Sequence, residues 1–447
     1  MATTMLRGHR RRTTRAVCAV ATLALLPGCA SSGTPADSLP GGTDDQEPSG
    51  VLEILVSSAD ASDDAFEAIN AAFEEEYPDV DINFSSVPNA EYPAAQSSRL
   101  TAGNVDILFA QPREVPSYAS ESMGNDARLA DSGAFLDLTD QAFMGNYTPS
   151  VLAAIAYGGR QYAVPTGLSY STGVYYNKSM FDELGLSVPT TWSEFLSVAE
   201  ELKANGITPL GIGGQDGWTA GLPMSAAVQG QFPTTEAKNE FAGQLWNQEA
   251  ALTDAKPLAV MKVVEQVFAL AQPGFGGVPY SSIPAGFAAG EYAMTPDGTW
   301  NQPVIAQAVG SAFDIGYFPL PTSENAADNQ ILNGKVELRL AVASSTENET
   351  AALAYLEFFS DPENYTTFVE LSGFAPAQPD VEPSEFLTSI SQYTGTFAPS
   401  WDQLWTPNTN AGAAALQPFD YPAIAPLGTK TAEEAAADAQ EAWAAAF

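Results

Sequence analysis

The chain has 447 residues, of which 54 are acidic and 17 are Lys or Arg, so its net charge is −37. A charge of that sign disfavours binding to nucleic acid or to an anionic membrane surface. The only two cysteines, Cys18 and Cys29, and the only histidine, His9, lie near the N-terminus. The rest of the sequence therefore offers no residues for a disulfide, a thiolate metal site or a histidine-based catalytic triad. We expect neither a metal nor a cofactor.

The N-terminus has the order of a secretory signal. Arginines between residues 7 and 15 precede an apolar stretch at residues 16–26, which ends at Pro27 and Gly28. This order is typical of a cleaved signal. The apolar stretch is shorter than the roughly 20 residues that a transmembrane helix needs. We therefore predict that residues 1–28 are a signal peptide.

Cys29 directly follows this segment. The run Leu-Pro-Gly-Cys at residues 26–29 resembles a lipobox, in which the cysteine becomes the lipidated first residue of the mature protein, although Pro27 departs from the usual small residue. A plain secretory signal with an incidental cysteine is the alternative. Residues 30–50 are rich in Ser, Gly, Thr, Pro and Asp, and this composition is typical of a flexible tether. Residues 29–50 are thus predicted to be a lipidated cysteine and a tether.

From residue 51 the chain predicts alternating strands and helices. The segments are an apolar run at 51–57, a helix with Phe66, Ile69 and Phe73 on one face, a strand at 80–84, a helix through Leu100 and a strand at 106–110. Such alternation predicts an α/β fold with a parallel sheet.

Ligands of open α/β sheets bind at the carboxyl ends of strands. Asp60 follows the first predicted strand, and Gln111 and Arg113 follow the third. We therefore predict that these three residues face a ligand. A position in a solvated loop is the alternative for each of them.

Further helices are expected along the rest of the chain. They lie at residues 192–203, 256–271, 350–359 and 431–447. Thr191 or Ser193 is placed to cap the first of these helices. Trp192 is interpreted as a packing residue and not as a ligand contact.

Three segments carry a family resemblance. Residues 162–214 contain Tyr-Tyr-Asn-Lys at 175–178, then Phe181, Gly185 and the pair Thr191 and Trp192. Residues 287–300 read FAAGEYAMTPDGTW, and residues 340–345 and 372–376 form the third segment. These segments resemble the carbohydrate-binding members of extracellular solute-binding protein family 1, the maltose-binding-protein-like lipoproteins of ABC importers.

The resemblance implies a class II periplasmic-binding-protein-like fold, with two α/β lobes joined by a hinge and a ligand cleft between them. The expected N-terminal lobe comprises residues 51–169 and 317–380. The expected C-terminal lobe comprises residues 170–316 and 381–447.

A sugar presents apolar CH faces and a fringe of hydroxyl groups, so its site needs flat aromatic surfaces and directional polar groups. Trp218 and Trp300 both lie in Gly-flanked loops, which favours ligand stacking over the packing role that tryptophan usually has. Asp216 and Asp297 are expected to accept hydrogen bonds from hydroxyl groups. Asp297 precedes Gly298, so capping a turn is its alternative role.

The resemblance adds two further aromatic residues. It places Tyr170 at the first crossing between the lobes, facing the cleft, and it puts one aromatic residue at Trp401 or Trp405. One of these two tryptophans is expected to pack. Arg339 is either a ligand donor or a partner for an acid such as Glu337.

We therefore predict a monomeric extracellular protein that binds a carbohydrate and delivers it to the permease subunits of an ABC transporter. A lipid anchor on the outer face of the cell membrane is expected. A binding protein for another solute, such as a polyamine, a peptide or a metal chelate, is the first alternative. A secreted glycoside hydrolase, which would need two suitably spaced acids, is the second.

Overall fold

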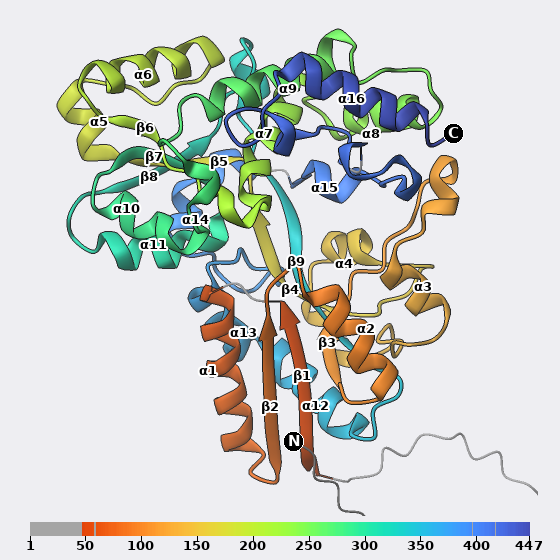
Figure 1. The fold of residues 1–447 in the computed structure, drawn as a ribbon. Coiled ribbons are helices and arrows are strands. Elements are labelled where there is room, and N and C mark those ends of the chain that lie inside the picture. Colours follow the sequence, from red (N-terminus) through yellow and green to blue (C-terminus); the bar gives the residue numbers. More distant parts are fainter. Residues whose placement is uncertain (1–46, 58–59, 396, 416) are drawn as a thin grey trace, which may run out of the picture. The chain divides into compact units, whose positions relative to one another are not determined.

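The computed structural model describes residues 47–57, 60–395, 397–415 and 417–447. The predicted signal peptide, Cys29 and most of the predicted tether lie outside these residues. Within them the fold is α/β with two separate sheets, as predicted (Figure 1). No described helix is long and apolar enough to span a bilayer.

The first sheet has six strands in the order β10-β9-β3-β1-β2, and β4 also pairs with β9. Its strands are β1 Gly50–Ser57, β2 Val80–Val87, β3 Ile107–Phe109, β4 Val164–Tyr170, β9 Asn333–Val342 and β10 Ala398–Pro399. The helices that accompany this sheet are α1 Asp60–Glu76, α2 Tyr92–Ala102, α3 Asn125–Asp131, α4 Pro149–Ile155, α12 Glu349–Ser360 and α13 Pro362–Ser372. Both β2 and β3 pair with β1 in parallel, which confirms the alternation predicted from the sequence.

Side-chain alternation along β1 builds a core on each face of this sheet. Ile54 and Val56 pack in one core with α1, α12 and α13, whereas Leu55 belongs to another with α2 and α3 (Figure 1). This follows from the two-residue period of a strand. The predicted face of α1 is confirmed, because Phe66 and Phe73 are both fully buried.

The second sheet has four strands in the order β6-β7-β5-β8. Its strands are β5 Gly173–Asn177, β6 Thr208–Leu210, β7 Tyr292–Asp297 and β8 Ile315–Pro319. Its helices are α5 Lys178–Leu184, α6 Trp192–Ala204, α7 Leu222–Gln231, α8 Thr235–Trp246, α9 Ala255–Phe268, α10 Ile283–Ala288, α11 Gln302–Val309, α14 Glu385–Ser389, α15 Trp401–Leu404 and α16 Ala432–Ala444. The helix α6 begins with a capping box at Thr191, and Trp192 is buried in the core, as predicted.

Two connections between the sheets lie side by side. The chain passes from β4 to β5 through Ser171 and Thr172, and it returns from β8 to β9 through residues 320–332. The Ser171 amide donates to the Asn333 carbonyl (2.8 Å), and the Asn333 amide donates to Thr172 Oγ1 (2.9 Å). The predicted lobe boundary at residue 317 falls within β8, which pairs with β5 along all five of its residues. The lobe boundaries stay a prediction.

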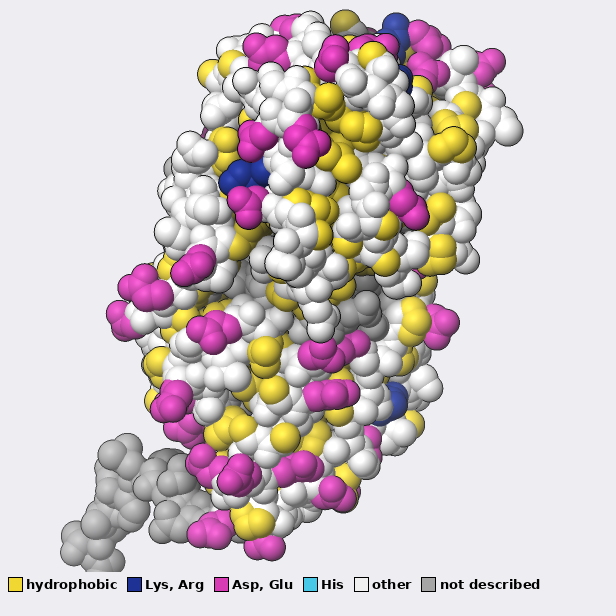
Figure 2. Space-filling model, turned by 90° about the vertical axis from the view of Figure 1, so that its left-hand side faces the viewer, with side chains coloured by type: hydrophobic (Ala, Val, Ile, Leu, Met, Phe, Trp, Pro, Cys, Tyr) yellow, Lys and Arg dark blue, Asp and Glu magenta, His cyan; other side chains and the backbone are white. Residues whose placement is uncertain are grey.

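Acidic side chains are spread over the face of the molecule shown in Figure 2, and few Lys or Arg side chains lie among them. Such a surface repels copies of itself, which supports solubility. Of the three cations near the site that are described below, Arg339 is buried, and Lys335 and Arg113 are partly buried.

Candidate functional site

Three aromatic side chains from separate loops of the second sheet meet at one place. Trp218 lies 4.9 Å from Tyr280 and 6.0 Å from Trp300 between ring centroids, and Trp300 Nε1 donates to the Tyr280 hydroxyl (2.9 Å). We call these three residues the aromatic cluster. Trp218 is 37% exposed, which is high for a tryptophan held by two other rings. The cluster therefore holds a partly exposed Trp218 side chain against two tilted rings.

Short backbone features hold the cluster in place. Asp216 Oδ2 accepts from the Tyr280 amide (2.7 Å) and so ties the Trp218 loop to the Tyr280 loop. A Cβ atom on Gly298 would lie 2.1 Å from the Trp300 ring. The glycine of the Gly-Thr-Trp motif is therefore needed because the ring folds back over its backbone.

Asp297 lies beneath the cluster and is fully buried. It accepts hydrogen bonds from Asn301 Nδ2 (2.6 Å), the Gly298 amide (2.7 Å) and the Tyr280 hydroxyl (3.0 Å). Burial raises the pKa of this carboxyl to about 7, although the three donors lower it. The turn-capping role is thus present, and through Tyr280 the same carboxylate also orients Trp300.

The titration of Asp297 predicts a pH-dependent stability. Because the folded-state pKa lies above the unfolded value, the folded protein keeps this proton between about pH 4 and pH 7 while the unfolded chain loses it, so stability falls as pH rises. We expect the stability of the wild type, relative to Asp297→Asn, to fall by about 4 kcal/mol from pH 4 to pH 8. Urea unfolding across this range measures the difference.

Asp140→Asn is the control for this experiment, because Asp140 is exposed. That variant should follow the pH dependence of the wild type closely. Parallel stability curves for the wild type and Asp297→Asn would show that the Asp297 carboxyl does not titrate in this range.

Strands of the first sheet reach the same place. The Tyr170 amide at the end of β4 donates to Thr299 Oγ1 (3.1 Å), next to Trp300. Lys335 Nζ on β9 lies 5.6 Å from the centre of the Trp300 ring and 3.2 Å from Glu337 Oε2. The aromatic cluster of the second sheet is therefore in contact with a charged face of the first.

The structure brings together five of the predicted site residues. These are Tyr170, Asp216, Trp218, Asp297 and Trp300, of which Tyr170 and Asp297 are buried and Trp218 and Asp216 are exposed. Their ligand contacts stay a prediction.

The other four predicted residues lie outside the aromatic cluster. Arg113 Nη1 donates to the Asp402 carbonyl (2.9 Å), and the Gln111 amide donates to Asp126 (2.7 Å). Asp60 is the first residue of α1, and its side chain lies outside what the structure describes. Trp401 is only 1% exposed and stacks on Trp405, which favours the packing role for this residue.

Three residues of the site were missed from the sequence. Tyr280 stands in a Gly- and Pro-rich stretch without a distinguishing pattern. Lys335 and Glu337 did leave a signal, because with Arg339 they put three charges on alternate residues of a buried strand. That spacing places all three on one face.

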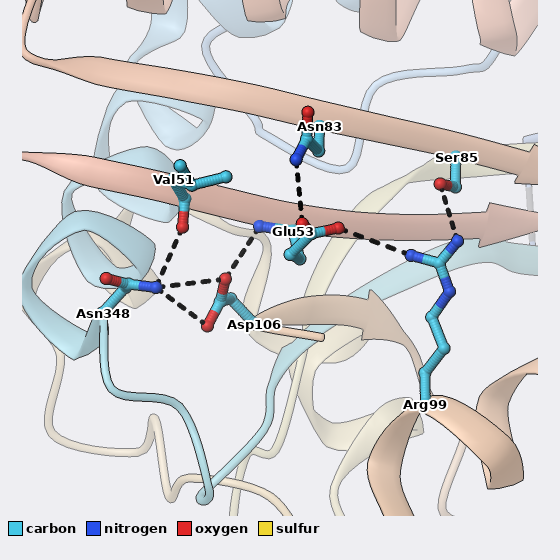
Figure 3. A network of polar contacts seen from close by, with 7 residues as sticks. All are labelled: Val51, Glu53, Asn83, Ser85, Arg99, Asp106 and Asn348. Atoms are coloured by element: carbon cyan, nitrogen blue, oxygen red, sulfur yellow. Dashed lines mark hydrogen bonds and ion pairs between the residues drawn. The ribbon is translucent and has the colours of Figure 1, made fainter. Parts of the chain in front are cut away.

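A hollow of about 600 Å³ opens at the edge strand β2, and none of the predicted site residues lines it. Its polar groups are largely engaged with one another: Glu53 accepts from Asn83 Nδ2 (2.8 Å) and pairs with Arg99 (3.6 Å), as Figure 3 shows. Asp106 and Asn348 continue the network across β1. One polar atom of the hollow, Asn70 Nδ2, has no hydrogen-bond partner among the described residues. Because the hollow contains none of the predicted site residues, the aromatic cluster is the better candidate site.

Among the residues that the structure describes, no group of three acids, His or Cys is placed to hold a metal ion. Aromatic rings, hydroxyl groups and charged side chains around the end of β4 and along β9 therefore define the site. Two α/β sheets joined by paired crossing segments, with aromatic and polar groups where they meet, define a two-lobed binding protein.

Residues 59–366 match the family of bacterial extracellular solute-binding proteins, and the chain belongs to that family. The multiple sugar-binding protein of Streptococcus mutans is 26% identical over 305 residues, which are 67% of this chain and 69% of that protein.

Solved structures of similar fold cover nearly the whole described chain. The protein RafE in complex with raffinose has a TM-score of 0.72 at 23% identity and covers 88% of this chain and 99% of its own. A sugar transporter protein of Bacillus licheniformis in complex with stachyose has a TM-score of 0.69 at 18% identity, with 88% and 98% covered. These likenesses confirm the predicted two-lobed fold.

Proposed function

We propose that this solute-binding protein binds a carbohydrate outside the cell and delivers it to the permease subunits of an ABC transporter. The observation that carries the proposal is the aromatic cluster, in which a partly exposed Trp218 is held by Tyr280 and Trp300 beside polar groups. Flat rings next to hydrogen-bonding groups match a sugar ring and its hydroxyl fringe. Relatives named for sugar binding support the same ligand class.

A binding role fits the acids of the site better than hydrolysis does. A glycoside hydrolase needs one carboxyl to protonate the leaving group and another to activate water or attack the sugar. Asp297 is fully buried, and both of its oxygens accept internal hydrogen bonds. Asp216 is engaged by the Tyr280 amide. We therefore infer that the protein releases its ligand unchanged and is not an enzyme.

Of the other solutes, a polyamine fits poorly. Lys335 Nζ lies 5.6 Å from the centre of the Trp300 ring, and Arg339 lies further along the same strand, near Arg113. Three cations would repel a polycation. A peptide remains an alternative ligand that the experiment below includes.

Ligand binding is proposed to close the two lobes about the paired crossing segments. Ser171 and Thr172 form one segment, and Asn333 ends the other. Hinge residues in such closures are a few positions at the ends of elements, as these are. The lobes would comprise residues 51–169 with 317–380 and residues 170–316 with 381–447.

The test of the function is the thermal stability of the purified protein with mono- and oligosaccharides, peptides and polyamines. A ligand at a hundred times its dissociation constant should stabilise the folded state by about 2.7 kcal/mol. A rise in Tm with one class of sugar, without turnover, is the expected result. A rise in Tm with peptides or polyamines alone would contradict the proposal that the ligand is a carbohydrate.

We also propose that Cys29 is lipidated and anchors a monomeric protein to the outer face of the cell membrane. In cells, Cys29→Ala should move the protein from the membrane fraction to the medium, because a plain signal leaves no lipid behind. The control is Cys18→Ala, which lies in the predicted signal peptide and should leave the distribution unchanged. If Cys29→Ala stayed in the membrane fraction, the proposal of a lipid anchor at Cys29 would be contradicted.

A further inference from the structure

The strand β9 carries a row of charges that the binding site described above uses only in part. Lys335, Glu337 and Arg339 stand on alternate residues and so share one face of the sheet. Their partners on β4 in the antiparallel register are Ser169, Gly167 and Pro165, respectively. The row begins at the Trp300 ring and continues away from it along β9.

Arg339 is 3% exposed, and it lacks the partners that a buried guanidinium needs. Within the described residues, neither its Nε nor its Nη1 has a hydrogen-bond acceptor. Burial, followed by the nearby Arg113, lowers the pKa of Arg339 to about 10. A buried charge without hydrogen bonds is costly, because desolvation is not offset.

Arg113 is a second cation near Arg339, and it is only partly buried. Its Nη1 donates to a neutral acceptor, the Asp402 carbonyl, and burial lowers its pKa as well. In the described part of the chain, neither Arg113 nor Arg339 forms an ion pair. Two neighbouring arginines that form no ion pair among the described residues are unexpected in a sequence with 54 acids and 17 basic residues.

Three acids act on this pair, and each is already engaged. Asp402, the first of the acids that act on Arg113, accepts from the Ser400 hydroxyl and from Gln403 Nε2 (2.7 Å). Glu337 accepts from the Ser169 hydroxyl and pairs with Lys335. Asp126 accepts from the Gln111 amide (2.7 Å) and from Gln96 Nε2 (3.1 Å). These carboxylates favour the charged form of the two arginines, but their oxygens already accept from other donors.

We propose that the ligand is an acidic oligosaccharide, with a sugar ring on the aromatic cluster and a carboxylate held by Arg339 and Arg113. This inference rests on the carbohydrate-binding function proposed above and names its substrate class. A guanidinium and a carboxylate form charge-assisted hydrogen bonds, which are the strong ones. Arg339 lies four residue steps after Lys335 along the strand, on the order of 13 Å, so the carboxylate belongs to a different ring from the stacked one.

The test compares pairs of oligosaccharides that differ in a carboxylate, using calorimetry on the full-length protein. Oligogalacturonates of two to four rings are set against galacto-oligosaccharides of the same lengths. Xylo-oligosaccharides with and without a glucuronic acid branch form the second set. We expect the acidic member of at least one pair to bind at least ten-fold more tightly than its neutral partner.

The variant Arg339→Met removes the charge and keeps an unbranched side chain. We expect its affinity for the acidic member to fall at least ten-fold, whereas the Tm of the ligand-free protein stays equal or rises, because an unpaired buried charge is lost. Arg339→Lys keeps the charge and serves as a second variant with intermediate affinity. Arg160→Gln, at an exposed ion pair with Asp137, is the matched control and should bind as the wild type does.

The outcomes separate this inference from the proposed function. Neutral members that bind as tightly as the acidic ones, or acidic binding that Arg339→Met leaves intact, would overturn the acidic ligand and leave carbohydrate binding in place. If the protein bound sugar phosphates and no sugar that carries a carboxylate, the proposal of a carboxylate on the ligand would likewise be overturned. Absence of binding by every sugar, together with binding of a peptide, would overturn both proposals.

Discussion

Replacing Trp401 by alanine is expected to lower the free energy of unfolding by about 3–5 kcal/mol, the usual cost of truncating a buried Trp. The side chain is 1% exposed in the core of the second sheet. Its ring lies 5.4 Å from Trp405, 5.9 Å from Phe419 and 6.0 Å from Phe241 between centroids. Removing it leaves a cavity among side chains that cannot fully collapse. Urea or thermal unfolding of the ligand-free protein measures the loss.

Phe447→Ala is the matched control, because Phe447 is a large aromatic residue that is 55% exposed. Its effect on the free energy of unfolding should be well below that of Trp401→Ala. A Trp401→Ala protein of unchanged stability that no longer binds sugar would show instead that Trp401 is a ligand residue.

Replacing Trp218 by alanine should weaken binding of the sugar that gives the largest thermal shift by about 10- to 100-fold, which corresponds to about 1.4–2.8 kcal/mol. The reason is that Trp218 is the most exposed described tryptophan, so much of its side chain is accessible to a ligand. Its stability cost should be small, since much of the side chain is already in contact with water. Isothermal calorimetry and urea unfolding of the same preparation separate the two effects.

The control for binding is again Phe447→Ala, which removes an exposed aromatic ring remote in sequence from the cluster. It should leave the dissociation constant unchanged. If Trp218→Ala bound the sugar with wild-type affinity, the ligand would bind away from the aromatic cluster, on another face of the molecule.

The local elements of the first sheet follow directly from the sequence. A strand has a two-residue period and a helix a period of 3.6, so the apolar pattern around Phe66, Ile69 and Phe73 predicts the buried face of α1 without further information. The capping box at Thr191 is likewise a local pattern, and it is present in the structure. Such features depend on neighbours within a few residues.

The candidate site is predicted less completely, because its members come from distant segments. Trp218 and Trp300 were found from their Gly-flanked loops, but Tyr280, which hydrogen-bonds to Trp300, carries no local signal. Trp401 and Trp218 look alike in sequence, since both are tryptophans in loop-like segments. One lies in the core and the other at the surface only because of how α15 packs against α7 and α8.

Composition, charge and periodicity by themselves determine that this chain is an α/β protein of strongly acidic character, without cysteine or histidine chemistry in its folded part. They also determine most of the faces that its helices and strands bury. Only the tertiary structure decides that the charged row of β9 begins beside Trp300 and that Arg339 is buried near Arg113 with two of its nitrogens unpartnered within the described residues. The physical reason is that whether a charged side chain is buried, and which groups surround it, depends on residues far apart in the chain. Arg113 and Arg339 are more than 200 residues apart, and no local pattern relates them.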